Sequence, residues 1–319
     1  MNRVETRFAY GEALAALGAQ NANVVALDAD LYNSTRSSVF KAQFPERFWD
    51  IGIAEQDLVS VAAGLAAGGL IPFCNSFAIF LTGRAYDQIR LQVCYAELPV
   101  RLAGSSAGLT LGADGASHQS LEDISLMRSL PNMTVIVPAD DLETQQATLA
   151  LGAFGGPAYL RLGRYPVPRV NASDYQFKIG QISRLRDGKD MTLFATGHMV
   201  WKALEAAELL SAAGVDARVV NVSTIKPLDG EAIMAEVGGM QAAFSVEEHS
   251  IIGGLGSAIA EVLAENLTAP LLFRRLGVRD CFGESASADE LLELHRLQPK
   301  PICEDVLRAL EQAAQPKPK

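Results

Sequence analysis

Short apolar runs alternate with longer helical patterns along most of this chain. In the first half, apolar runs predict buried strands at 24–27, 48–53, 99–103, 134–137 and 158–162. Apolar residues spaced three and four apart predict the helices between them, at 8–17, 56–67, 80–95, 121–130 and 142–151. Strands that alternate with helices in this way are typical of βαβ units. The pattern therefore predicts an α/β fold, with a mostly parallel sheet and helices on both of its faces.

The segment 164–178 interrupts the alternation, because it is polar, contains two prolines and follows neither period. We therefore expect a first domain at 1–165, a linker at 166–184 and a smaller α/β domain at 185–319. The strands predicted in the second domain are 191–195, 217–222, 242–246 and 271–274. Its predicted helices are 200–213, 230–237, 257–265, 288–294 and 302–313, and we expect the tail at 316–319 to fray.

The composition narrows the class of protein. Hydrophobic residues make up 49% of the 319 positions and charged residues 20%, so the chain can bury a large core. The net charge of −10 argues against nucleic acid as the main partner, since a phosphate backbone selects basic surfaces. No apolar run reaches the ~18 residues that a membrane span needs. The four cysteines form no CxxC pair and the four histidines have no metal-ligand spacing, so we expect a cytoplasmic protein with free thiols and no metal ligands.

Glu55 lies at the junction between the predicted strand 48–53 and the predicted helix 56–67. The carboxyl ends of parallel strands are the edge at which open α/β sheets bind ligands. A carboxylate in a first helical turn more often only interacts with the helix dipole. The function of Glu55 therefore depends on what the neighbouring segments contribute.

Two further segments contain candidate binding residues. Phe77 and Phe80 share one face of a helical turn, where they either pack in the core or form a platform for a flat heterocycle. The loop 104–119 is rich in small and polar residues, and long loops in compact domains are usually functional. Its ionisable residues are Asp114 and His118, which either bind hydroxyl groups and move protons or are simply a turn aspartate and an exposed histidine.

Polar residues at strand ends and helix starts could receive an anionic group. They are Arg7, Ser34, Arg161 and Arg164, each of which alone would more often be a surface residue. The glycine-rich segment 253–256 (GGLG) has neither the Lys-Ser/Thr of a phosphate loop nor the third glycine of a dinucleotide motif. We interpret it as tight packing between a strand and a helix.

Taken together, these motifs resemble the C-terminal half of transketolase. The matching stretches are VVALDADLYNST, IAEQDLVSVAAGLA, PFCNSFAIF, GRAYDQIR, LGADGASHQSLEDISLMRSLPNM, STIKPLD and VEEHSIIGGLG. The resemblance implies a pyrimidine-binding domain at 1–165 and a transketolase C-terminal domain at 185–319. A full transketolase also has a GDG…N motif that binds the diphosphate of thiamine diphosphate and Mg²⁺, and this chain has no such motif. The resemblance therefore implies one subunit of a split transketolase, partnered by a separate diphosphate-binding N-terminal subunit in a heterotetramer.

The resemblance also implies which residues contact the cofactor. Glu55 matches the glutamate that hydrogen-bonds the aminopyrimidine ring and favours its imino tautomer. Phe80, and secondarily Phe77, match the aromatic residues on which that ring stacks. Asp30 matches an acidic residue near the cofactor of the neighbouring site.

The implied substrate contacts lie in the 104–119 loop and at the strand ends. Asp114 matches a residue that binds a sugar hydroxyl, and His118 matches a substrate-contacting position and is, with Glu55, a candidate catalytic residue. The residues that match the clamp on the terminal phosphate of the sugar are Arg7, Ser34 and Arg164. Ser106 stands where transketolases have a clamp histidine, which leaves less positive charge for the phosphate.

The implied activity is transfer of a two-carbon ketol unit from a ketose phosphate, an unusual or branched one included, to an aldose phosphate. Two other functions stay open. One is that of a 2-oxo acid dehydrogenase β subunit or of an enzyme similar to deoxyxylulose-phosphate synthase, and the clamp residues argue against the former. The other is a non-catalytic scaffold or regulatory subunit, which would need none of Glu55, Phe80 and Asp114.

Overall fold

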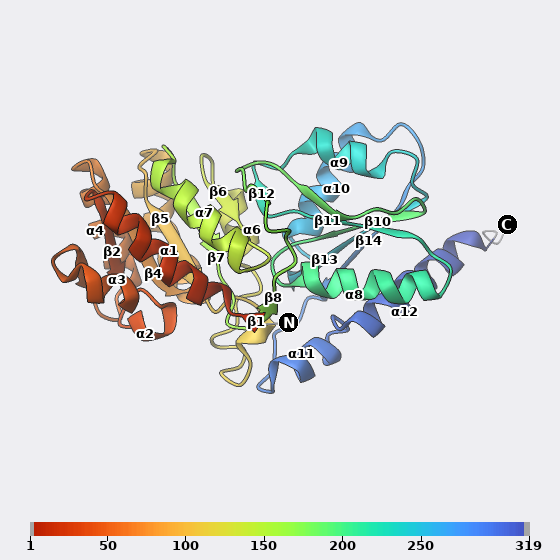
Figure 1. The fold of residues 1–319 in the computed structure, drawn as a ribbon, viewed down its shortest axis with the longest axis horizontal. Coiled ribbons are helices and arrows are strands. Elements are labelled where there is room, and N and C mark those ends of the chain that lie inside the picture. Colours follow the sequence, from red (N-terminus) through yellow and green to blue (C-terminus); the bar gives the residue numbers. More distant parts are fainter. Residues whose placement is uncertain (1–2, 316–319) are drawn as a thin grey trace.

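The structure, a computed structural model, describes residues 3–315, so the predicted tail at 316–319 lies outside the described residues. Two α/β units lie side by side, each built on its own twisted sheet (Figure 1). The two-unit α/β fold expected from the sequence is confirmed.

The first unit contains a seven-stranded sheet in the order β12-β6-β7-β5-β4-β2-β3. These strands are β2 (Val24–Asp28), β3 (Phe48–Asp50), β4 (Ile71–Phe77), β5 (Arg101–Ser105), β6 (Thr134–Ile136), β7 (Ala158–Arg161) and β12 (Thr224–Lys226). All neighbouring strands are parallel except β12, which runs antiparallel to β6. Central strands such as β2 are buried along their whole length, which explains their nearly continuous apolar sequence.

Helices cover both faces of this sheet. One face packs against α1 (Thr6–Gln20), α3 (Ser38–Gln43) and α7 (Asp141–Ala153). The other face packs against α4 (Glu55–Ala67), α6 (Asp123–Ser129) and a segment with two π-helical parts, η2 (Phe80–Arg84) and η3 (Ile89–Tyr95), joined by α5 (Tyr86–Gln88). The remaining short elements are α2 (Tyr32–Thr35), η1 (Pro45–Arg47) and η4 (Leu109–Leu111).

The second unit contains a five-stranded sheet in the order β14-β13-β10-β11-β9. Its strands are β9 (Ser183–Arg186), β10 (Met191–Ala195), β11 (Ala217–Asn221), β13 (Ala242–Ser250) and β14 (Leu272–Val278), and only β9 is antiparallel. Its helices are α8 (Met199–Ala212), α9 (Gly230–Val237), α10 (Leu255–Asn266), α11 (Ala288–Leu294) and α12 (Pro299–Ala314). The helices α8 and α12 pack on one face of the sheet, and α9 and α10 on the other (Figure 1).

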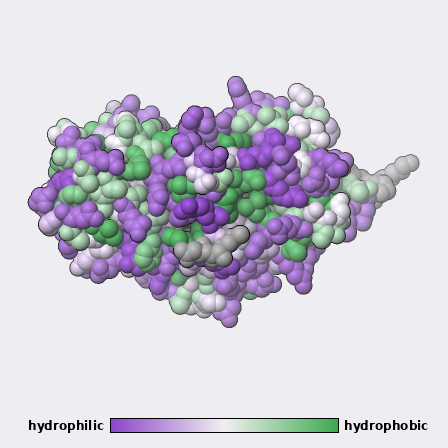
Figure 2. Space-filling view, in the orientation of Figure 1, coloured by the Kyte–Doolittle hydropathy of each residue, from purple (hydrophilic) through white to green (hydrophobic). Residues whose placement is uncertain are grey.

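The two units are joined by more than the chain that connects them. The strand β12 follows β11 of the second unit but pairs with β6 of the first sheet. The segment 166–184, expected as a linker, contains β8 (Val167–Pro168), which pairs with β1 (Arg3–Val4). One hydrophobic core also runs through residues of α4, α6, α9 and α10. The visible face of the molecule has a group of hydrophobic residues near its middle, between the two units (Figure 2).

Several element predictions need correction. The strand predicted at 48–53 ends at Asp50, because Gly52 has a left-handed φ of 80° and starts the turn into α4. The single helix predicted at 80–95 is instead broken into η2, α5 and η3. A strand was expected to end near Phe73, whereas β4 continues to Phe77, and the prediction did not include β9, β12, α2 or α3 as elements.

Candidate functional site

Glu55 is the first residue of α4 and only 4% of it is exposed. Its carboxylate is held by Arg84, at the end of η2, whose Nη1 donates to Oε1 and to Oε2 at 3.1 Å each. The two side chains line an open groove, called the Glu55 groove below, together with Ile53, Ala54, Gln56, Asp57 and Ser60. A buried carboxylate thus faces a solvent-accessible space and has a partner from a neighbouring element.

An aromatic platform continues from this ion pair. The rings of Phe77 and Phe80 are stacked, with centroids 5.9 Å apart and planes 14° from parallel. The guanidinium carbon of Arg84 lies 4.1 Å from the centre of the Phe80 ring. His118 meets Phe80 edge-on at 5.1 Å. The structure therefore brings Glu55, Phe77, Phe80 and His118 together, and Arg84, a residue that the sequence analysis missed, joins them.

This arrangement is suited to a flat ring that carries hydrogen-bond donors. The planar guanidinium of Arg84 already lies on the Phe80 face while donating to Glu55. An aromatic face next to a carboxylate would hold an aminopyrimidine by the same two interactions.

The loop between β5 and α6 divides into a buried base and an exposed tip. At the base, Gly108 has a φ of 85°, and a Cβ there would meet the carboxyl group of Glu248 from the second unit. Gln119 donates to the carbonyl of Leu109 at 3.3 Å, to that of Gly112 at 3.2 Å and to that of Glu284 at 2.9 Å. The base of the loop is therefore fixed between the two units.

The predicted site residues of this loop are separated by that division. Asp114 is exposed at the tip, with His118 half-buried beside it. Ser106 is completely buried, has a left-handed φ of 56°, and its Oγ has no hydrogen-bond partner among residues 3–315. The structure does not bring Ser106 to the surface on which Asp114 lies.

A second group of predicted residues meets at the start of α1, and we call it the arginine edge: Arg7, Ser34, Asp114 and Arg164. The Nη1 of Arg7 donates to the carbonyl of Ser34 at 2.8 Å, and its Nε to Glu5 at 2.5 Å. The backbone N–H of Arg7 donates to the carbonyl of Gly163 at 3.4 Å, which places Arg164 next to it. The Nη1 of Arg164 lies 3.5 Å from the Oδ2 of Asp114.

The interpretation of Arg161 as an anion-receiving residue is wrong. Its side chain is 6% exposed and forms an ion pair with Asp123 at 2.7 Å. Its Nη2 donates to the carbonyls of Ser120 at 3.3 Å and Glu248 at 3.0 Å. Because its Nε and Nη2 donors are used inside the protein and its charge is paired with Asp123, Arg161 joins the two units instead of offering a free cation at the arginine edge.

Asp28 orders the segment that carries Asp30 and Ser34, and the sequence analysis missed it. Its carboxylate accepts hydrogen bonds from the Leu31 backbone at 2.6 Å and from the Thr35 and Ser37 hydroxyls at 2.7 and 2.8 Å. Burial raises the pKa of Asp28 to about 6. An aspartate that ends a buried strand and precedes a Thr and a Ser was the available signal. Asp30 itself is exposed, with a left-handed φ of 60°.

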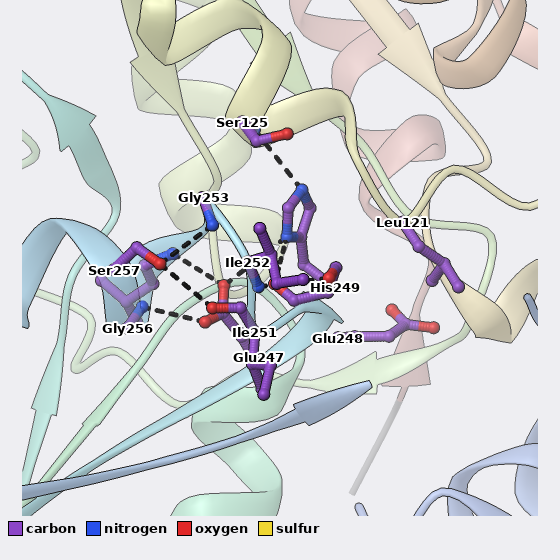
Figure 3. A network of polar contacts seen from close by, with 12 residues as sticks. Leu121, Ser125, Glu247, Glu248, His249, Ile251, Ile252, Gly253, Gly256 and Ser257 are labelled. Carbon is purple, nitrogen blue, oxygen red and sulfur yellow. Dashed lines mark hydrogen bonds and ion pairs between the residues drawn. The ribbon is translucent and has the colours of Figure 1, made fainter. Parts of the chain in front are cut away.

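The segment 253–256 packs against a buried polar network on β13, which agrees with its interpretation as tight packing (Figure 3). The Glu247 carboxylate accepts hydrogen bonds from the backbone N–H groups of Leu255 at 2.7 Å and Gly256 at 2.9 Å. Burial raises the pKa of Glu247 to about 7. The start of α10 is therefore occupied by a carboxyl group of the chain itself.

His249, on the same side of β13 as Glu247, completes this network (Figure 3). Its Nε2 accepts a hydrogen bond from the Ser125 backbone at 3.4 Å, so Nδ1 carries the proton and donates to the Ser250 carbonyl at 2.7 Å. Burial lowers the pKa of His249 to about 4, in keeping with a neutral ring.

The described residues contain neither a cluster of metal ligands nor a membrane-spanning helix. Within residues 3–315 no group of three or more His, Cys, Asp or Glu side chains could hold a metal ion. No helix in the same range is long and apolar enough to cross a membrane.

Two family models match the chain. "Transketolase, pyrimidine binding domain" matches residues 2–169, and "Transketolase, C-terminal domain" matches residues 180–302. The chain belongs to the transketolase family. The resemblance noted from the sequence is thereby confirmed, and enzymes of this family in general depend on thiamine diphosphate.

Relatives in this family include chains of the same length. The chain is 44% identical to a "putative transketolase C-terminal section" of Methanocaldococcus jannaschii, over 96% of each chain. It is 45% identical to the "6-deoxy-6-sulfo-D-fructose transketolase subunit SqwH" of Clostridium sp. (strain MSTE9), over 93% of this chain and 91% of that one. A solved "split gene transketolase, inactive beta4 tetramer" has a TM-score of 0.89 and 47% identity, covering 97% of this chain and 99% of that one. The transketolase family to which this chain belongs thus includes members encoded as separate C-terminal subunits.

Proposed function

We propose that this chain is the C-terminal subunit of a two-chain, thiamine diphosphate-dependent transketolase. The complex moves a two-carbon ketol unit from a ketose to an aldose, each with an anionic group at its far end. The observation that supports this most strongly is the buried carboxylate of Glu55 in the Glu55 groove, linked to the Phe80 ring by the guanidinium of Arg84.

The bound cofactor would supply the nucleophilic carbon that attacks the carbonyl of the ketose. Glu55 would hold the aminopyrimidine ring by accepting a hydrogen bond from its protonated ring nitrogen, in the position where it now accepts from Arg84. Phe80 would stack against that ring, and Phe77 fixes Phe80 from behind. Burial of the carboxylate excludes water that would compete for this hydrogen bond.

The substrate would extend from the platform to the arginine edge. His118 contacts Phe80 and lies in the same loop tip as Asp114, so it connects the two groups of residues. His118 and Asp114 would bind hydroxyl groups of the sugar, and Arg7 and Arg164 would bind its terminal anion. Because the Clostridium relative is named for a sulfonated sugar, such a sugar is a candidate substrate here beside the phosphorylated ones.

The diphosphate and Mg²⁺ would be bound by a partner N-terminal subunit. The large apolar side chain of Ile53 lines the Glu55 groove and is 75% exposed. The partner subunit would cover it, and this contact would close the groove. The solved split-gene transketolase is described as an inactive tetramer of β chains, which supports self-association of such chains without activity. The proposed complex is a heterotetramer of two chains of each kind.

The central test is Glu55→Gln in the complex assembled from both subunits. Turnover should fall by about 10²–10⁴-fold, the usual contribution of a positioned acid or base, while cofactor uptake stays largely intact. Glu265→Gln, which changes an exposed carboxylate near the end of α10 and outside the groove, is the matched control and should keep turnover. Full activity of Glu55→Gln would refute the assignment.

A second test separates substrate anion binding from chemistry. Arg164→Ala should raise the KM for phosphorylated sugars far more than for uncharged sugars, and equal effects would refute the clamp. The isolated chain should transfer no ketol unit and retain no diphosphate. Activity without a partner chain would overturn the split-subunit proposal.

A further inference from the structure

Arg36 occupies a backbone position that the surrounding residues hold rigidly. Its φ is 69°, a left-handed value that is uncommon for an arginine. Thr35 and Ser37, its two neighbours, both hydrogen-bond the buried carboxylate of Asp28. On the other side α1 packs so closely that a Cβ at Gly11 would lie 2.6 Å from the Arg36 carbonyl oxygen. Strained residues fixed from several sides are concentrated at functional sites.

The Arg36 side chain is directed to the arginine edge by stacking. Its guanidinium carbon lies 3.5 Å from the centre of the Phe8 ring, and Phe8 follows Arg7 in α1. Ser34, two residues before Arg36, accepts a hydrogen bond from Arg7. Burial and the nearby charge of Arg7 both lower the pKa of Arg36. Two guanidinium groups therefore lie close enough to repel each other.

The charge of Arg36 has no ion-pair partner in the part of the chain that the structure describes, and the carboxylate of Glu5 offsets the lowering of its pKa only in part. Arg7 has Glu5 as its partner, and Arg164 has Asp114. Arg36 has no ion-pair partner among residues 3–315, and its Nε is shielded from solvent without an acceptor there. A guanidinium that has no carboxylate partner can bind an oxyanion through its Nη donors.

We propose that Arg36 is a third cationic residue of the arginine edge and binds the terminal oxyanion of the sugar together with Arg7 and Arg164. The shared chemistry of the ligand is a tetrahedral group with several oxygens, as in a phosphate or a sulfonate. Stacking on Phe8 orients the planar guanidinium for two-point contact with such a group. Arg36 also supplies a positive charge that position 106 lacks, since Ser106 is uncharged and buried.

That the anion belongs to a sugar substrate rests on the proposed function. That Arg36 binds an anion does not depend on it. The binding test therefore uses the isolated full-length chain, titrated with methyl phosphate and with methanesulfonate and followed by calorimetry. Arg36→Asn removes the charge and keeps a residue that tolerates the left-handed backbone. Arg36→Lys keeps the charge, and Arg274→Asn replaces an exposed arginine of β14 as the control.

Arg36→Asn should weaken binding of the preferred probe about tenfold or more, the usual effect of losing a hydrogen bond to a charged group. Arg36→Lys should recover part of it, and Arg274→Asn should bind as the unmodified chain does. Preference for methyl phosphate would assign a phosphorylated ligand, and preference for methanesulfonate a sulfonated one. Unchanged binding by a folded Arg36→Asn chain, or no binding of either probe by the unmodified chain, would overturn the assignment.

The assembled two-chain enzyme provides the second measurement. With Arg36→Asn, the KM for a ketose carrying a terminal anion should rise about tenfold, while kcat and the KM for a neutral four-carbon ketose stay unchanged. Equal changes for both donors would refute a role in anion binding. Absence of ketol transfer in the unmodified complex, with anion binding by this chain still lost in Arg36→Asn, would instead refute the proposed function alone.

Discussion

Replacing Arg84 by methionine tests the centre of the proposed site, because Arg84 occupies two surfaces that the cofactor would need. Its Nη1 donates to both oxygens of Glu55 at 3.1 Å, and its guanidinium covers Phe80 at 4.1 Å. Methionine keeps an unbranched, polarizable side chain against the ring but removes the charge and the donors.

The magnitude follows from the exposure of the two partners. Glu55 is 4% exposed and Arg84 49%, so solvent screens one end of the pair. A hydrogen bond to a charged group contributes about 1.5–3 kcal/mol when buried, and an exposed ion pair about 0–1 kcal/mol. We therefore expect Arg84→Met to lower the free energy of unfolding of the isolated chain by about 1 kcal/mol, seen as a Tm about 1–2 °C lower.

Cofactor binding should change in the opposite direction. An aminopyrimidine that hydrogen-bonds Glu55 and stacks on Phe80 has to displace Arg84, so removing Arg84 removes a competitor. With about 1.4 kcal/mol per tenfold change, the Kd of thiamine diphosphate for the two-chain complex should fall about fivefold in Arg84→Met. Calorimetric titration of the complex measures it, and Arg90→Met, an exposed arginine of η3, is the control. Weaker cofactor binding by Arg84→Met would refute the competition, and an unchanged Tm would refute the ion pair.

Three further predictions concern stability and are checked by urea denaturation. Burial raises the pKa of Glu248 to about 8. Between pH 5 and pH 8 the folded chain therefore keeps a proton on Glu248 that the unfolded chain releases. The stability of the folded chain consequently falls as the pH rises. As the pH rises from 5 to 8, the free energy of unfolding of Glu248→Gln should therefore increase by more than about 1 kcal/mol relative to that of the unmodified chain. A difference between the two chains that does not change with pH would contradict the raised pKa of the buried carboxyl group. Gly108→Ala should lower the free energy of unfolding by about 2 kcal/mol or more, since the φ of this residue is 85° and the new Cβ would meet Glu248. Gly64→Ala is the control: it lies in α4 with open space around it and should raise the free energy of unfolding by about 0.5–1 kcal/mol. Arg101→Met should lower the free energy of unfolding by about 3 kcal/mol or more, because the buried guanidinium donates to the carbonyls of Leu151, Phe154 and Gly156 at the end of α7. A decrease of less than about 1 kcal/mol would contradict this structural role.

The alternation of strands and helices can be predicted from the sequence alone. The strand at 191–195 and the helices at 230–237 and 288–294 have the bounds predicted from apolar spacing. This succeeds because the period of apolar positions is a local property, set by which face of a helix or strand is buried. The motifs likewise identified the transketolase family, and with it the candidate residues Glu55, Phe80 and Asp114.

Which of these residues face a shared space depends on how the chain folds in three dimensions. Arg161 and Arg164 are three positions apart, yet the former is buried against Asp123 and the latter is half-exposed beside Asp114. Arg84 is a candidate binding residue because it contacts Glu55, 29 positions away. Arg36 is one because it stacks on Phe8, 28 positions away. Similarly, the pairing of β12 with β6 joins segments about ninety residues apart. Burial, pairing and the balance of charge depend on such distant contacts, which no local period along the chain encodes.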